Sequence, residues 1–285
     1  MVLELEQRIK DPSMRLLLID LATSVLDNVQ DNPRKAALTL EGARIAAAAG
    51  RSDLQAHFMA KTADLAMLQV AVWHHSRSML QLAPRWFQFA TEADKKEHDA
   101  LTSLINELEE KINSLLTDAI AISTQNDNKK VRASVHMSRG GVDAAKYMRY
   151  KMDCMRGFRA KLWSRFEFVR YPVPEYLLTI SNGDAEKLRR YVKSFTHQFL
   201  RAAHFAEEDD DLLAAHAYHN LAVYLKSAYR FRAARKYLAK SRAIARRHNN
   251  TPLLQQLDAL EAYIRAKNRD TPDYLRGESR PRHRT

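Results

Sequence analysis

Residues that interrupt helices are scarce in this chain. Only 7 Gly and 8 Pro occur among 285 residues, while Ala, Leu, Arg, Lys and Gln are abundant. In a helix interior Gly and Pro cost about 1 and 3 kcal/mol, whereas the abundant residues favour the helical state. The sequence therefore predicts an all-α fold, as one elongated or two compact domains with a sizeable core.

Apolar residues recur at helical spacing, and polar turns separate the periodic segments. The predicted helices cover residues 1–31, about 34–49, 54–82, about 94–125, 129–138, 142–171, 184–208, two helices within 215–248, and 253–267. Thr91 and Asp94 can cap the fourth helix, whereas Gly140 and Gly141 are expected to break the chain. Residues 184–208 form either one helix or two that divide near Thr196.

Pro172 and Pro174 mark the best candidate for a domain boundary. They separate an N-terminal helical array (1–171) from a back region (175–269), which ends in a capping helix. The following segment, 270–285, is rich in Arg and is predicted to be a disordered basic tail.

Charge is distributed unevenly along the chain. Residues 1–128 carry a net charge of −5 and residues 129–285 carry +17, which together give the overall +12. This asymmetry indicates either an anionic partner for the C-terminal half or an acidic half that docks onto a basic one.

Several classes of function lack support in the sequence. Cys154 is the sole cysteine, which excludes an internal disulfide and a thiolate-rich metal site. The glycines form neither of the two common phosphate-binding loops, and no local motif activates a nucleophile. The acidic N-terminus and the short apolar runs argue against a signal peptide and a membrane span. We expect a soluble, cytoplasmic, non-enzymatic protein with no cofactor.

Two histidine pairs are candidate metal ligands. His216 and His219 lie three residues apart, and His74 and His75 are adjacent. Neither pair has a carboxylate at helical spacing, so no metal site is predicted.

The stretch 215–248 contains two amphipathic helices joined near Tyr229 and Arg230, which must pack antiparallel. One helix presents Tyr218, Leu221, Ala222 and Leu225, and the other presents Ala234, Tyr237, Leu238 and Ser241. Small residues on both helices allow their axes to approach closely, while the larger ones fill the space beside them.

This stretch resembles a tetratricopeptide repeat, whose 34-residue pattern places Trp, Leu, Gly, Tyr, Ala, Phe and Pro at set offsets. Those offsets hold Tyr218, Leu221, Ala222, Leu225, Ala234, Leu238 and Arg246 here. The resemblance implies antiparallel helix pairs that form a right-handed, tetratricopeptide-like α-solenoid. A spacing of 39 residues between Ala206 and Ala245 suggests a variant with longer helices.

The resemblance also implies a peptide-binding groove lined by the first helix of the repeat. Asn220 occupies the position whose amide hydrogen-bonds the ligand backbone in that family, and a side-chain amide suits this role because it both donates and accepts. The other groove-facing positions hold His216, His219, Val223 and Lys226.

No acidic residue occurs between Leu212 and Leu257, whereas nine Lys and Arg do. The candidate anion- or nucleic-acid-binding residues in this stretch are Arg230, Arg235, Lys236, Lys240, Arg242, Arg246 and Arg247. A second basic segment adds Arg156, Arg159, Lys161 and Arg165. Trp163 and Tyr150 lie off its core stripe and are candidates to stack on unpaired bases.

Two features of the N-terminal half have competing interpretations. The apolar seam in 95–125 either packs within the chain or forms a homodimer. Residues 39–61 superficially resemble the DNA-binding head of TetR-type repressors, through Thr39, Ile45-Ala46, Ala49-Gly50, Ser52, His57-Phe58 and Lys61. Their spacing departs from that family's pattern, which favours a pair of packed Ala-rich helices instead.

These observations favour an adaptor, scaffold or regulator that binds a protein or acidic peptide through the groove and the basic face. The main alternative is a protein that binds RNA or single-stranded DNA through its basic half. A TetR-like regulator and an enzyme on a helical scaffold are the remaining alternatives.

Overall fold

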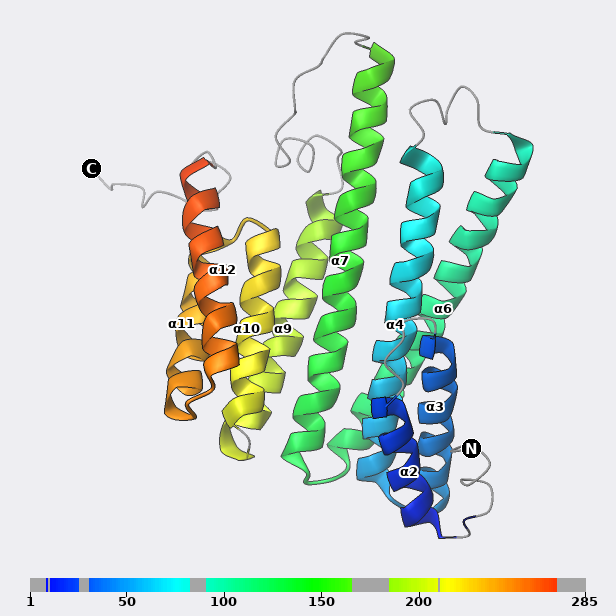
Figure 1. The fold of residues 1–285 in the computed structure, drawn as a ribbon, viewed down its shortest axis with the longest axis vertical. Helices are drawn as coiled ribbons and strands as arrows, with labels where there is room; N and C mark the ends of the chain where they lie inside the picture. Colours follow the sequence, from blue (N-terminus) through cyan, green and yellow to red (C-terminus); the bar gives the residue numbers. More distant parts are fainter. Residues whose placement is uncertain are drawn as a thin grey trace. The chain divides into compact units, whose positions relative to one another are not determined.

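The computed structural model describes residue 9 and residues 11–25, 31–82, 91–165, 185–209 and 211–270. These ranges contain nine α-helices and no strand, which confirms the all-α prediction (Figure 1). The chain packs as two compact units, Met1–Val142 and Asp143–Thr285, and their boundary falls within the continuous helix α7 (Lys129–Arg165). The predicted boundary at Pro172 and Pro174 lies outside the described residues, as does the predicted tail after Asp270.

The first unit is built around the long helix α4. Its helices are α2 (Pro12–Val25), α3 (Asn32–Ala48), α4 (Ser52–Leu82), α6 (Glu92–Thr124) and the first part of α7. Helix α4 packs against both α3 and α6, and α2 packs against α3 (Figure 1). The stretch with the superficial TetR-like resemblance, residues 39–61, lies on α3, the following turn and α4, and that alternative stays a prediction.

Small residues allow α3 and α4 to lie close together. Ala46 and Ala63 are completely buried, and the Thr62 hydroxyl donates to the Thr39 hydroxyl at 2.8 Å. A Cβ atom on Gly42 would lie 3.0 Å from the Phe58 ring. Glycine at this position therefore leaves room for the buried aromatic side chain.

Both ends of α6 carry specific hydrogen bonds. Thr91 and Asp94 form the predicted capping box, in which the Asp94 backbone N–H donates to Thr91 Oγ1 at 3.1 Å. At the other end, the Arg132 side chain donates to the carbonyl oxygens of Ser123 and Thr124 at 3.0 and 3.1 Å. Arg132 thus pairs with carbonyls that the end of a helix leaves without partners.

The predicted break at Gly140 and Gly141 is wrong, because α7 runs through both glycines without interruption. Two glycines lower helix propensity by about 2 kcal/mol in total. Val135, Val142 and Ala144 around them are almost fully buried. Burial of these flanking side chains offsets the propensity cost, so tertiary packing determines the outcome.

The second unit contains the remainder of α7 and four more helices, α9 (Ala185–Asp209), α10 (Asp211–Ser227), α11 (Phe231–Arg247) and α12 (Thr251–Asp270). Helix α10 packs against α9 and α11, and α11 packs against α12 (Figure 1). Helix α9 is a single helix with no division at Thr196. Its Phe195 and Phe199 are buried one turn apart and both contact the Tyr224 ring.

The predicted interface between α10 and α11 is confirmed at the level of packing. Ala222, Ala234 and Ser241 are completely buried, and Leu225 and Leu238 are nearly so. The Ser241 hydroxyl donates to the Ala215 carbonyl oxygen at 2.8 Å, which shows how closely the two backbones approach.

Three tight turns with the same backbone geometry join consecutive helices. Gly50, Tyr229 and Asn249 have positive φ angles of 68°, 57° and 50°. In each turn the next backbone N–H reaches back five residues, from Arg51 to Ala46, from Arg230 to Leu225 and from Asn250 to Ala245. This arrangement is the Schellman ending of a helix, and it reverses the chain within a few residues.

Ser241→Leu tests whether close approach holds α10 against α11. The larger side chain has no room at this fully buried position, so we expect a loss of about 2–3 kcal/mol of unfolding free energy and a lower Tm in thermal denaturation. Ala239→Leu, at an exposed position of the same helix, is the matched control and should change stability by less than about 0.5 kcal/mol. Equal effects of the two changes would contradict close packing at Ser241.

His57 should make the stability of the protein depend on pH. Burial, followed by the positive charge of Lys61, lowers the pKa of His57, and the charge of Asp20 opposes this only in part. The folded state therefore binds a proton less readily than the unfolded state. The contribution of His57 to the free energy of unfolding is complete above the ordinary histidine pKa of about 6.5. It is lost as the pH falls through the lower pKa that His57 has in the folded state.

We expect Tm to decrease between pH 7 and pH 5, and the decrease to be smaller in His57→Gln. His75→Gln, which changes an exposed histidine on the same helix, should retain the full pH dependence. Thermal unfolding followed by circular dichroism measures both slopes, and indistinguishable slopes in the two variants would refute the role of His57.

Candidate binding surfaces

The predicted groove residues form one row on the outer side of α10. His216 is exposed, and His219, Asn220, Val223 and Lys226 are half-buried. The buried residues Ala214, Leu221 and Leu225 occupy the opposite side of the helix. We refer to these five side chains as the α10 row.

One end of the α10 row lies beside α12. The Lys226 ammonium group lies 4.3 Å from the centroid of the Tyr263 ring. Tyr263 is 46% exposed, so part of this aromatic ring faces solvent. A positive charge and an apolar surface are therefore adjacent at this end of the row.

His219 and Asn220 interact within the row. Burial and the neighbouring His216 lower the pKa of His219, and its hydrogen bond with the Asn220 side chain opposes this shift. This environment favours the uncharged form of His219, which has one donor and one acceptor nitrogen. The α10 row thus presents groups that match both halves of a peptide unit.

The seven predicted anion-binding residues on and beside α11 have different surroundings. The Arg242 guanidinium pairs with Asp258 at 2.8 Å and with Glu261 at 2.6 Å, and its side chain is only 18% exposed. Arg247 pairs with Asp211 at 3.3 Å, and the Lys240 ammonium donates to the Tyr218 hydroxyl at 3.3 Å. These three cations already have partners within the second unit.

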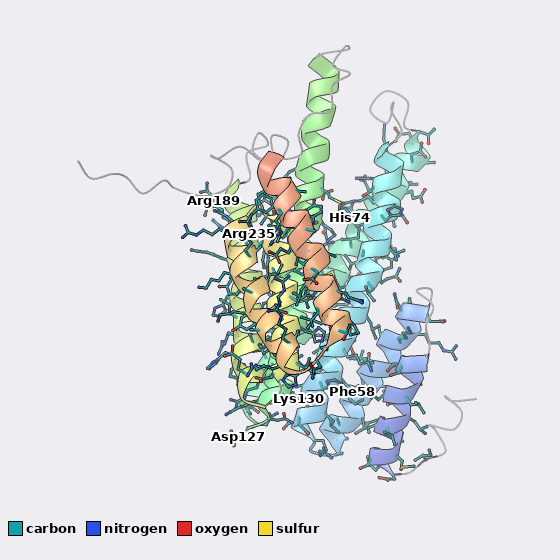
Figure 2. The ribbon with its side chains drawn as sticks, turned by 60° about the vertical axis from the view of Figure 1, so that its left-hand side comes forward. Phe58, His74, Asp127, Lys130, Arg189 and Arg235 are labelled. Atoms are coloured by element: carbon teal, nitrogen blue, oxygen red, sulfur yellow. The ribbon has the colours of Figure 1, made fainter. Side chains whose placement is uncertain are left out.

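The remaining four cations differ from these three in their pairing. Arg230, Arg235, Lys236 and Arg246 are exposed, and no ion pair joins them to an acidic side chain in the described part of the chain. Arg232 shares this property. Free positive charge on α11 is therefore concentrated on its solvent-exposed side, where Figure 2 labels Arg235.

The second basic segment, on α7, is largely packed within the chain where it is described. The Lys151 ammonium donates to the Ser227 carbonyl oxygen at 2.9 Å and lies 4.6 Å from the Tyr229 ring centroid. Tyr150 contacts the Tyr191 ring and the Lys187 ammonium, so it is not a free stacking surface. The side chains of Arg156, Arg159, Lys161, Trp163 and Arg165 lie outside the described residues.

The sequence reasoning missed a row of basic and imidazole side chains on α9. The exposed residues Arg189, Lys193, His197, Arg201 and His204 share one side of this helix, and we refer to them as the α9 stripe. The sequence contains a feature that indicates this row, because no acidic residue occurs from Lys187 to Ala206.

The apolar seam of residues 95–125 packs within the chain. Ile112 and Ala119 of the predicted stripe are completely buried, and so are, nearly or fully, the neighbouring Ile105 and Leu116. Helix α6 packs against α4. The other leucines and isoleucine of the predicted stripe are half-buried, except for Leu104, which is 44% exposed. The seam is therefore used mainly for packing inside the first unit, and the homodimer through 95–125 stays a prediction.

Within the described ranges, two other kinds of site are absent. No three His, Cys, Asp or Glu side chains within them are grouped closely enough to hold a metal ion. None of the helices there combines the length and apolar character that crossing a membrane requires. No protein-family model, curated protein sequence or solved structure matches this chain.

Arg242→Ala and Arg235→Ala should separate a structural cation from a solvent-exposed one. Arg242 joins α11 to α12 through two carboxylates, and its hydrogen bonds lower the pKa of Glu261. We expect Arg242→Ala to reduce the unfolding free energy by about 1 kcal/mol, and Arg235→Ala to change it by less than about 0.5 kcal/mol. Urea denaturation measures both values, and an equal loss in the two variants would contradict this assignment.

Proposed function

We propose that the α10–α11 pair is a tetratricopeptide-like repeat with α12 as its capping helix. We further propose that the protein is a non-enzymatic adaptor that binds an extended protein segment along the α10 row. The observation that carries this proposal is the row itself, in which amide, imidazole, apolar and positively charged groups share one outer side of a tightly packed helix.

Packing fixes the α10 row before any ligand binds. Helix α10 lies between α9 and α11, and the Lys151 ammonium bonds to the Ser227 carbonyl oxygen at its C-terminal end. A surface that is already ordered loses little conformational entropy on binding, so more of the interaction free energy contributes to affinity.

The chemistry of the row suits a peptide backbone better than a small metabolite. The Asn220 amide has both donor and acceptor capacity, and the uncharged form of the His219 ring adds to it. Val223 and the exposed part of Tyr263 supply apolar area for a ligand side chain. Lys226 beside Tyr263 favours an acidic residue in the bound segment.

Asn220→Ala provides the direct test. Peptides would first be selected against the full chain from a displayed library of random sequences, and their affinities then measured by fluorescence anisotropy. We expect Asn220→Ala to weaken binding of the selected peptides by about tenfold, since a lost hydrogen bond in a half-buried site costs about 1–2 kcal/mol. Tm should remain nearly unchanged.

Asn106→Ala is the matched control, because Asn106 is exposed on α6 in the first unit. It should leave peptide affinity unchanged. Selected peptides that bind both variants as tightly as the native protein would overturn the α10 row as the binding site. A selection that yields no binding peptide would also count against the adaptor.

A further inference from the structure

Between the exposed Glu186 and Glu207, which lie one turn beyond its two ends, the α9 stripe holds only basic and imidazole side chains, and the packing of α9 fixes its direction. On the opposite side of α9, Leu188, Phe195 and Phe199 are buried, and the Ser194 hydroxyl donates to the Asp143 carboxylate at 2.6 Å. Helix α9 therefore cannot rotate without losing its core contacts, so its five stripe residues remain exposed to solvent.

Helix α11 adds positive charge to the same part of the second unit. The Tyr218 hydroxyl donates to Glu207 on α9 at 2.6 Å and accepts from Lys240 on α11 at 3.3 Å. This chain of hydrogen bonds links the two helices through α10. Figure 2 labels Arg189 of α9 and Arg235 of α11 on the same side of the ribbon.

The five residues of the α9 stripe extend over most of the length of the helix. Arg189 and His204 are 15 residues apart, which corresponds to about 22 Å at a rise of 1.5 Å per residue. Successive members lie three or four residues apart, so one charged or planar group recurs on each helical turn. An extended, regularly charged polymer matches such a surface better than a compact anion does.

The planar side chains of the stripe favour a polymer that carries unpaired bases over an acidic peptide. His197, Arg201 and His204 follow one another on adjacent turns. The Arg201 guanidinium lies 5.7 Å from the Phe205 ring centroid, and the His204 ring centroid lies 5.6 Å from the same ring. Imidazole and guanidinium planes stack on unpaired bases, whereas an acidic peptide would use only the positive charges.

We propose that the α9 stripe, together with the exposed Arg232, Arg235 and Lys236 of α11, binds single-stranded nucleic acid. The cations neutralise phosphates, and the three planar side chains of α9 stack on bases. This surface and the α10 row consist of different side chains, because none of the five row residues belongs to α9 or α11.

Fluorescence anisotropy with the full chain tests the proposal. The probes are a labelled oligouridylate of about 20 nucleotides, a DNA duplex of similar length and polyglutamate, each titrated from about 50 to 200 mM salt. We expect the oligouridylate to bind tightest. Arg189→Ala, Lys193→Ala and Arg201→Ala combined should weaken it at least tenfold and reduce the slope of log K against log salt by about 2, or about 0.7 per lost phosphate contact.

The matched control removes three exposed lysines from α6, as Lys95→Ala, Lys96→Ala and Lys111→Ala combined. It changes the net charge equally and should retain binding within about twofold. His197→Ala with His204→Ala, measured at pH 8, should weaken the oligouridylate but not polyglutamate, because it removes stacking without removing charge. Circular dichroism verifies that each variant is folded.

Three results would overturn the proposal. These are equal affinity of the native protein and the α9 triple variant, tighter binding of polyglutamate than of the oligouridylate, and tighter binding of the duplex. Asn220→Ala should bind the oligouridylate normally, so failure of the peptide site and failure of the nucleic-acid site give different results.

Discussion

Within the described ranges, three turns with a left-handed residue determine how the helices that they join can pack. Gly50, Tyr229 and Asn249 reverse the direction of the chain immediately after a helix, so the next helix must return alongside the one before it. Glycine adopts this conformation at no steric cost, whereas Tyr229 does so with strain. The Tyr229 ring contacts Phe231 and the Lys151 ammonium, and these contacts help to offset that strain. Helix pairing therefore depends on side-chain contacts as well as on backbone hydrogen bonds.

Local pattern predicted the helices and one interface well, because the relevant interactions are close in sequence. The Thr91 and Asp94 cap and the small residues between α10 and α11 lie where periodicity and spacing place them. The break predicted at Gly140 is wrong because the interactions that decide it are distant in sequence. Helix propensity describes an isolated segment, and the buried Val135 and Val142 stabilise α7 through contacts that no local pattern reveals.

The charged surfaces are likewise only partly predictable from the sequence. An acid-free stretch from 212 to 257 correctly indicated excess positive charge, but it could not show that Arg242 is paired with Asp258 and Glu261 of the following helix. Ion pairing engages some cations of this stretch and leaves others, such as Arg235, exposed. Charge counted along the chain does not reveal the α9 stripe, because the stripe depends on the helical spacing of Arg189, Lys193 and Arg201.

Burial on one side of a helix leaves the other side available, and the second unit uses this property twice. Helix α10 directs its buried stripe toward α9 and α11, which leaves the α10 row outside. Helix α9 buries Phe195 and Phe199, which leaves the α9 stripe outside. The two rows differ in chemistry, since one holds an amide beside an imidazole and the other holds exposed cations. A helix that packs on one side can therefore present a second side with its own chemistry, and the α10 row and the α9 stripe consist of different side chains.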